Sequence, residues 1–269
     1  MLDSHGKLAV LEMIIYIPVA FFCIFNNIKH GFRREAGWIY LTLFCGVKLS
    51  GAGMTIHIQE SEDTSLLTTA TVLNSVALSP LLNATLSFLN AHPKDTDQSF
   101  MRRASFFLKP LHLMIIVGLG LSVIGGIDET KLDQTDLDNG AKALKIASAL
   151  FVLAWTGLLI GCLIFLFHLS ELTRSHRRMV LAVALALPFL LVRVVYSALN
   201  AVNLNTSGSE HTTNKWNPVT GSWVLYLILG LAMETATVGI YSFTGVLAYH
   251  EAKALRISQD GSHLELLSR

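Results

Sequence analysis

Seven apolar runs, each about twenty residues or longer, constrain this chain of 269 residues more than any other feature. A helix needs about twenty apolar residues to cross the hydrocarbon core of a bilayer, so each run is long enough to form one span. Of the residues, 52% are hydrophobic and 14% charged, whereas about a quarter are charged in a soluble domain. We therefore predict an all-α integral membrane protein, a seven-helix bundle with spans at about 8–28, 36–58, 66–91, 106–127, 143–168, 179–200 and 222–249.

Basic residues near the span ends predict the orientation of the bundle, because Lys and Arg are retained on the cytoplasmic side. The segments after spans one, three, five and seven are rich in basic residues, whereas QESEDTS between spans two and three has none. Three lysines in and just after the loop before span five are the exception. The totals place the amino terminus outside or in the lumen, a single transmembrane domain over 1–250 and a cytosolic tail over 251–269.

A glycosylation sequon begins at Asn205, in the loop between spans six and seven. The predicted orientation places this loop on the lumenal side, where such a sequon can be modified, although its closeness to span six can prevent this. We expect a glycoprotein of the endoplasmic reticulum, another endomembrane or the plasma membrane.

Four ionisable side chains lie deep within the predicted spans, namely Glu12, Lys48, Arg193 and Glu234 in spans one, two, six and seven. A charge at the centre of a bilayer costs about 2.5 to 3.5 kcal/mol on insertion scales, so these groups should face protein or water. Two acids and two bases at similar depth favour pairing. We expect Lys48 to pair with Glu234. Arg193 would then pair with Glu12, although the exchanged pairing is nearly as favourable, and the quartet could also be purely structural.

Polar residues recur around these charges in steps of three and four, which keeps them on one face of a helix. Span seven carries the longest stripe, Gly230, Glu234, Thr237, Tyr241 and Thr244. Spans one, three and six carry shorter stripes, so the internal lining should come from spans one, two, three, six and seven. Span five, with its run GLLIGCLIFLF, should mainly face lipid. In span two the small residues Gly46, Ser50 and Gly53 have the spacing of close helix packing.

Several chemistries are absent from the sequence. A net charge of +1 without a long basic run gives no reason to expect nucleic acid. The sequence has no His-x-x-x-His pair for a metal and no Gly-x-Ser-x-Gly elbow for a nucleophilic serine. It also lacks the Asp-Arg-Tyr motif that follows span three in seven-helix receptors. A retinal protein needs a Schiff-base lysine in span seven, and that span has no lysine. The three cysteines, all inside apolar runs, are interpreted as small hydrophobic residues. We expect no metal and no cofactor, so any catalysis would use acid and base side chains.

The segments LEMIIYIPVAFF, GWIYLTLFCGVKLSGAGMT and ETATVGIYSFTGVLAYH carry a resemblance that extends over the whole chain. The chain resembles an uncharacterised family of fungal seven-helix membrane proteins, whose members are often products of secondary-metabolite gene clusters. In size, span number and membrane-depth carboxylates it is also similar in architecture to the fungal membrane-bound terpene cyclases. The resemblance implies a seven-helix fold and a link to terpenoid or polyketide biosynthesis.

These observations predict a polar pocket between spans one, two, three, six and seven, open to the outer leaflet or lumen, for a small hydrophobic molecule. Glu234 or Glu12 would protonate an epoxide, alkene or carbonyl, with Tyr241 and Lys48 positioning charge. The expected ligand-binding residues are Lys48, Arg193, Asn74, Tyr196, Thr237 and Tyr16. The protein would be a cyclase or isomerase whose partners are membrane lipid and this molecule. The alternative is a non-enzymatic receptor, sensor or lipid-handling protein that uses the same charges as a switch.

Overall fold

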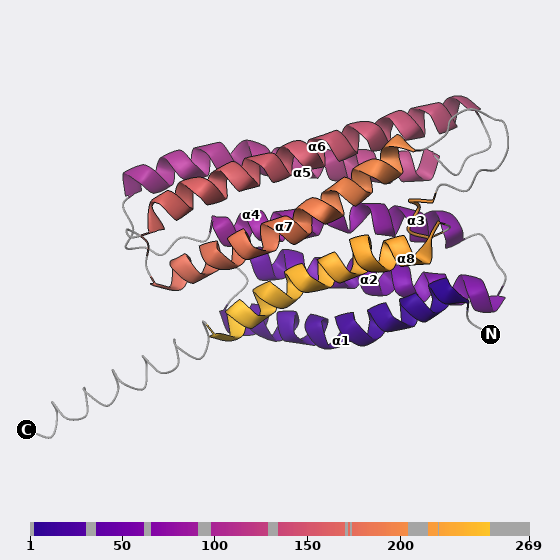
Figure 1. Ribbon diagram of the computed structural model, residues 1–269, viewed down its shortest axis with the longest axis horizontal. Coiled ribbons are helices and arrows are strands. Elements are labelled where there is room, and N and C mark those ends of the chain that lie inside the picture. The colour runs from indigo at the N-terminus through magenta and orange to yellow at the C-terminus, as the bar shows by residue number, and fades with distance from the viewer. Residues whose placement is uncertain are drawn as a thin grey trace, which may run out of the picture.

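The computed structural model describes residues 3–30, 36–61, 66–90, 98–128, 134–169, 172, 174–203, 215–219 and 221–247. These residues form helices and short connections without a strand, and seven helices are long and apolar enough to cross a membrane (Figure 1). The predicted fold class, a seven-helix all-α bundle, is confirmed. The sequon at Asn205 and the tail after residue 250 lie outside the described residues.

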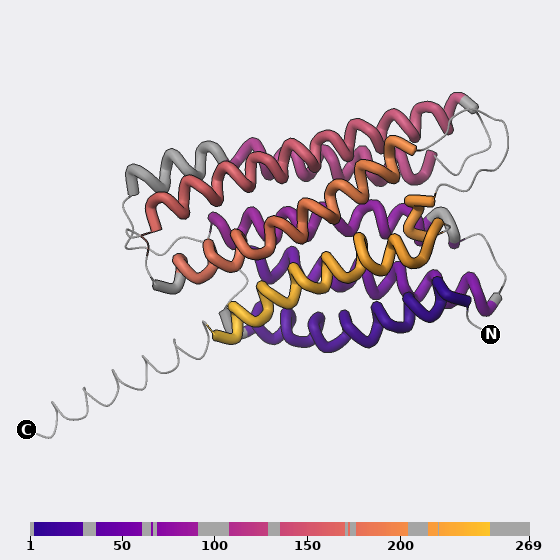
Figure 2. The backbone as a smooth tube through the Cα atoms, in the orientation of Figure 1, coloured from indigo at the N-terminus to yellow at the C-terminus, as the bar shows by residue number. Residues whose placement is uncertain are grey.

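The elements follow one another as long helices that run up and down the bundle. They are α1 (Ser4–His30), α2 (Ala36–Ser61), α3 (Leu67–Val76), α4 (Leu78–Leu89), α5 (Gln98–Asp128), α6 (Gln134–Phe167), α7 (Arg174–Val202), α8 (Trp223–Leu225), the π-helix η3 (Tyr226–Ala232) and a helix over 233–247. Span one starts at one end of the bundle, called here the amino-terminal end, and span seven finishes at the opposite end (Figure 2). Helix α4 packs against α2, α5, α6 and α7, so span three is the central span.

Helix α6 is longer than a membrane requires. Its 34 residues correspond to about 51 Å of helix, whereas the hydrocarbon core is about 30 Å thick. It begins at Gln134 and not near residue 143 as the hydropathy predicted. The additional turns carry Asp136 and Asp138 and therefore belong to the aqueous side at the amino-terminal end.

Four spans contain a proline, and one of these spans is divided into two helices. Span three is interrupted at Ala77, which separates α3 from α4 three residues before Pro80. Pro18, Pro110 and Pro188 lie inside α1, α5 and α7. Next to Pro188, the indole of Trp155 donates a hydrogen bond to the Leu187 carbonyl at 3.1 Å, so a neighbouring helix satisfies backbone near this proline.

The outer surface of the bundle is apolar. Helix α6 exposes Leu153 and Ile160 on one face, and buries Phe151 and Leu158 on the other. Large exposed side chains also line α1, where Phe21 is 71% exposed. Such surfaces are stable in lipid and not in water, which supports an integral membrane protein.

The small-residue stripe of α2 does not pack inside the bundle, so that expectation is wrong. Gly46 and Ser50 are exposed, and a Cβ added at Gly46 or Gly53 would meet nothing within 4 Å. The reason is the neighbouring Lys48, which lies two residues after Gly46 and therefore on the opposite face of the helix. Because Lys48 must face its acidic partners, the stripe faces outward.

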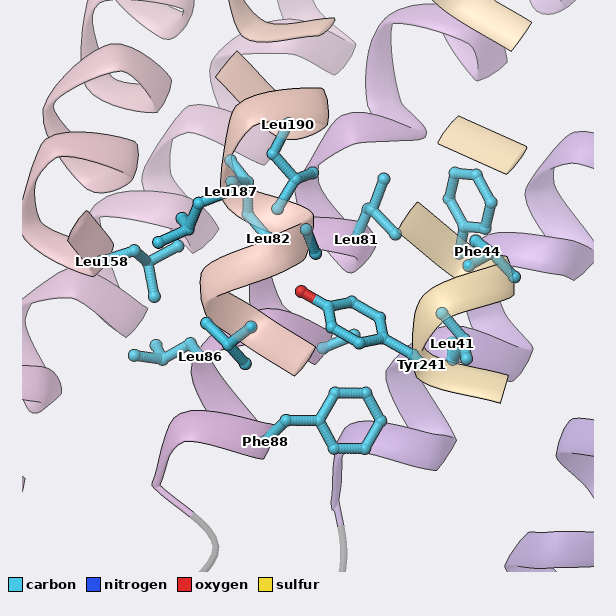
Figure 3. Close-up of a cluster of buried hydrophobic side chains, with 14 of the residues drawn as sticks. Leu41, Phe44, Leu81, Leu82, Leu86, Phe88, Leu158, Leu187, Leu190 and Tyr241 are labelled. Carbon is cyan, nitrogen blue, oxygen red and sulfur yellow. The ribbon is translucent and has the colours of Figure 1, made fainter. Parts of the chain in front are cut away.

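The apolar core extends along the bundle, from Leu8 near the amino-terminal end to Leu89 near the opposite end. Figure 3 shows the ring of Tyr241 surrounded by leucine and phenylalanine side chains. Its hydroxyl lies 2.8 Å from Thr85 Oγ1, and its ring contacts Phe88 with 5.0 Å between centroids. Nearby, a Cβ at Gly245 would approach the Trp38 ring to 2.3 Å, so this packing requires glycine. The three cysteines are buried free thiols, as expected.

Candidate functional site

Glu234 lies at the centre of a group of buried charges in the half of the bundle toward the amino-terminal end. Lys48 Nζ lies 2.6 Å from Glu234 Oε2, and Arg193 Nε donates to Glu234 Oε1 at 2.5 Å. Lys48 is only 2% exposed, Arg193 3% and Glu234 0%. Two cations around one carboxylate leave one positive charge to be neutralised.

Glu12 supplies the missing negative charge from α1. Its Oε1 lies 3.6 Å from Lys48 Nζ and accepts a hydrogen bond from the Tyr226 hydroxyl. Glu12 is also buried, at 4% exposure. The four charges sum to zero, and their mutual attraction offsets part of the desolvation cost of placing them at membrane depth. The term "buried network" denotes these four residues with Tyr226 and Asn74.

Tyr226 connects Glu12 to Lys48 and Asn74 in the buried network. Besides its bond to Glu12, its oxygen accepts from Lys48 Nζ at 3.0 Å, and it lies 3.1 Å from Asn74 Oδ1. The hydroxyl has one proton, which it can donate either to Glu12 or to Asn74. Asn74 Oδ1 also accepts from Lys48 Nζ at 3.4 Å. The backbone carbonyl of Asn74 accepts from Arg193 Nη2 at 3.4 Å.

The π-helix η3 places Tyr226 and Glu234 on the same face of span seven. Eight residues of a regular α-helix make two turns and about 80° more, which would rotate Tyr226 away from Glu234. A π-helix has hydrogen bonds over five residues and so turns less per residue, which offsets that drift. Both side chains consequently reach Lys48.

Gly230 makes room for two tyrosine rings beside the buried network. A Cβ at this position would lie 2.8 Å from Cδ2 of Tyr226 and 3.8 Å from Cε1 of Tyr196. Tyr196 lies on α7 one turn after Arg193, whose Cζ is 5.6 Å from the centroid of its ring. The Tyr196 hydroxyl is buried and has no hydrogen-bond partner among the residues that the structure describes. A buried polar group left unpaired costs about 1 to 3 kcal/mol.

A short connection covers the amino-terminal end of this region. The Ser222 amide donates to the Lys215 carbonyl at 3.0 Å, and His5 Nε2 lies 3.1 Å from the Gly221 carbonyl oxygen. The Trp216 ring packs edge-on against Tyr196 with 6.4 Å between centroids. The described residues of this connection therefore lie beside the buried network at the amino-terminal end, and the predicted opening toward the outer side stays a prediction.

Asp3 fixes the relative height of the helices that carry Glu12 and Lys48. Its Oδ1 accepts from the Gly6 amide at 2.9 Å, which caps α1, and from the Gln59 side chain at the end of α2. Partial burial alone would raise the pKa of Asp3, but these hydrogen bonds outweigh burial and hold the pKa below its usual value. The contact ties α1 to α2 just outside the membrane spans.

The structure brings together most of the residues that the sequence singled out. The buried network comes from spans one, two, three, six and seven, the five that the polar stripes indicated. Lys48 pairs with Glu234, as expected. Arg193 pairs with Glu234 and not with Glu12, because the two oxygens of Glu234 accommodate both cations while Tyr226 bonds to Glu12.

Four of the predicted site residues, Tyr16, Tyr196, Thr237 and Tyr241, lie at the edge of the buried network or away from it. Tyr241 follows Glu234 by seven residues, about 10 Å along the helix, and bonds to Thr85. Thr237 is buried and donates to the Met233 carbonyl of its own helix at 2.9 Å. Tyr16, one turn after Glu12, lies 3.4 Å from the Thr235 hydroxyl. Tyr16 borders the buried network, whereas Tyr241 belongs to the apolar core.

Sequence reasoning missed Tyr226, which contacts Glu12, Lys48 and Asn74 in the buried network. A signal was present, because Tyr226 lies one step of four before Gly230, at the start of the polar stripe of span seven. Among the described residues, no group of three His, Cys, Asp or Glu side chains could hold a metal ion.

A family model described as "Domain of unknown function (DUF7702)" matches residues 2–251, nearly the whole chain. Comparisons with curated proteins and with solved structures find no match. The family description assigns no activity, so the roles of the buried residues must be argued from their geometry.

Proposed function

We propose a proton-transferring site within the membrane for this chain, which belongs to the family described as "Domain of unknown function (DUF7702)". The site binds a small hydrophobic molecule beside Glu12 and Tyr226. The observation that supports this proposal is the position of the Tyr226 hydroxyl, which bonds to the Glu12 carboxyl and accepts from the Lys48 ammonium at 3.0 Å. An acid, a tyrosine and an ammonium group in contact form a short path for a proton.

Glu12, and not Glu234, is the proposed proton donor. Glu234 has cations at 2.5 and 2.6 Å, and a carboxylate held by two close cations binds a proton poorly. Glu12 has one cation at 3.6 Å, so it can alternate between the acid and the carboxylate. Glu234 and Arg193 would then orient Lys48, and Tyr241 takes no part in the step.

The proposed reaction is a cyclisation or isomerisation without a redox change. Glu12 in its protonated form, which leaves the buried network with one net positive charge, gives its proton to an epoxide, alkene or carbonyl, and Lys48 stabilises the carboxylate that forms. The substrate rearranges and returns one proton to Glu12 directly or through Tyr226, so atoms and charge balance. The resemblance of the sequence to fungal proteins of secondary-metabolite clusters supports a terpenoid or polyketide substrate.

The test compares metabolites in a deletion strain complemented by variants of this chain. We expect the deletion strain and the Glu12→Gln variant to accumulate an uncyclised or unisomerised precursor. The control is Glu60→Gln, an exposed acid on α2, which should restore the product as wild type does. Full product formation by Glu12→Gln would refute the proposal, provided that immunoblots show equal amounts of protein.

A second candidate is a non-enzymatic receptor, sensor or lipid-handling protein. The observation that favours it is that the buried network is closed and electrically neutral, with every charged member at most 4% exposed. Such a group can stabilise one arrangement of five helices until a ligand separates the ions and allows another arrangement. An unchanged metabolite profile, together with saturable ligand binding to purified protein, would favour this function.

We also propose the orientation in which the amino-terminal end faces the lumen or exterior, in the endoplasmic reticulum, another endomembrane or the plasma membrane. The excess of basic residues at the other end supports it. Endoglycosidase should then shift the gel mobility of wild type but not of Asn205→Gln. A carboxy-terminal tag should be digested by protease added from the cytosolic side. A tag protected in sealed vesicles of cytosol-outward orientation would contradict this orientation.

A further inference from the structure

We infer that Tyr196 forms a subsite that binds an oxygen atom of the hydrophobic ligand. The inference rests on the proposed function and names the class of its ligand: a hydrophobic molecule that carries one hydrogen-bonding oxygen, such as a long-chain alcohol, ketone or epoxide.

The Tyr196 hydroxyl is the observation from which the inference starts. Tyr196 is 1% exposed, and no atom in the described part of the chain makes a hydrogen bond with its hydroxyl. Other buried hydroxyls without a partner, on Ser79 and Ser242, belong to serines, whose short side chains can rotate to the carbonyl of the preceding helical turn. The hydroxyl of a tyrosine is too far from its own backbone for this. It therefore requires a partner from another element, from a buried water or from a ligand.

The second step is the position of Tyr196 relative to the buried network. Its ring and the Tyr226 ring both border Gly230, where a Cβ would lie 3.8 Å from Tyr196 and 2.8 Å from Tyr226. An oxygen bound at Tyr196 therefore lies on the side of span seven that carries the Glu12–Tyr226 contact. The subsite would hold one end of the substrate while the reacting bond lies near Glu12.

The third step is the chemistry of the surroundings. The Trp216 ring contacts Tyr196 at an interplanar angle of 61°, and the Arg193 guanidinium lies 5.6 Å from the Tyr196 ring centroid. Aromatic rings favour an apolar ligand body, and the adjacent cation disfavours a ligand with a positive charge. A pure hydrocarbon would leave the hydroxyl unpaired. A neutral oxygenated hydrophobic molecule satisfies all of these groups.

Photolabelling of the full chain in lipid nanodiscs tests the inference. The probe is a C16 alcohol that carries a diazirine and an alkyne, and the matched probe is the corresponding alkane without the hydroxyl. We expect the alcohol to label peptides of α7 or span seven saturably. Unlabelled hexadecanol should compete with it, and hexadecane should not. Tyr196→Phe should weaken the apparent affinity for the alcohol about five- to ten-fold, the usual effect of one hydrogen bond.

The control variant is Tyr241→Phe, which removes a buried tyrosine hydroxyl that Thr85 satisfies. It should label as wild type does, and both variants should keep the melting temperature of wild type within a few degrees. Equal labelling by alcohol and alkane, or unchanged affinity in Tyr196→Phe, would overturn the inference. So would equal losses in the two variants.

Failure of this inference differs from failure of the proposed function. The Glu12→Gln variant should still bind the alcohol probe through Tyr196 while it loses product formation. Full product formation by Glu12→Gln refutes proton donation by Glu12 and leaves the labelling result unaffected. Loss of selectivity between the probes refutes the subsite even when Glu12→Gln is inactive.

Discussion

Span seven buries two tyrosines, and the two ends of the bundle satisfy their hydroxyls in different ways. Tyr226 lies among four charges and contacts side chains from three other spans. Tyr241 lies among leucine and phenylalanine side chains (Figure 3). Its hydroxyl bonds to a single neutral hydroxyl on Thr85. Burial of charge requires several partners in exact positions, whereas burial of an apolar surface requires only complementary shape.

The two regions should therefore respond differently to mutation. An apolar core tolerates swaps that conserve volume, and its losses scale with the atoms removed. A buried ion network is no more stabilising than a well-packed apolar core, yet removing one member leaves its partners charged and unpaired. Four predictions follow this difference from the largest effect to the smallest.

Glu234→Gln should have the largest effect, because it leaves Lys48 and Arg193 with only Glu12 to neutralise them. Breaking a buried pair destabilises a protein by about 3 to 5 kcal/mol. Titration of the detergent-solubilised protein with SDS would measure the loss in free energy of unfolding. The control Glu60→Gln on the exposed part of α2 should change stability by less than about 0.5 kcal/mol. A loss for Glu234→Gln as small as that of the control would mean that the ions do not form the contacts described.

Tyr226→Phe should destabilise more than Tyr241→Phe. The first substitution removes hydrogen bonds to charged groups, worth about 1.5 to 3 kcal/mol. The second leaves Thr85, whose hydroxyl still donates to the Leu81 carbonyl at 2.9 Å, so its loss should be about 0.5 to 1.5 kcal/mol. The same unfolding measurement compares them. An equal or reversed order would contradict the distinction between the two ends.

Alanine substitutions at three glycines of span seven distinguish the effect of tight packing from the effect of disturbing the buried network. Gly245→Ala would push a methyl group into the Trp38 ring, and Gly230→Ala would push one into the Tyr226 ring. Each should cost about 1 to 3 kcal/mol. Gly239→Ala is the matched control, because nothing lies within 4 Å of the added Cβ. Only Gly230→Ala should also impair the proposed proton transfer, measured as product formation per amount of folded protein.

Gly46→Ala and Gly53→Ala on α2 should have the smallest effect. Their added methyl groups meet nothing within 4 Å, and alanine favours a helix by up to about 1 kcal/mol relative to glycine. Melting temperatures of the purified protein should therefore stay the same or rise slightly. A clear drop would show that this face of α2 packs against another protein or another copy.

The sequence predicted the bundle better than it predicted the buried network. Hydropathy alone indicates seven spans, and steps of three and four residues indicate which helices carry a polar face. The pairing of Arg193 depends on the exact positions of side chains on different helices, which periodicity does not contain. The role of Tyr226 depends on η3, because helical periodicity assumes 3.6 residues per turn and a π-helix departs from it. The direction of the small-residue stripe depended on Lys48, whose partners had to be known first.

The distribution of the buried network along the chain has a consequence for its biogenesis. Glu12, Lys48 and Asn74 belong to the first three spans, Arg193 to the sixth, and both Tyr226 and Glu234 to the last. A nascent chain that lacks the last span holds two cations for one carboxylate in its membrane segments. The buried network therefore becomes neutral and fully hydrogen-bonded only after span seven has joined the other spans.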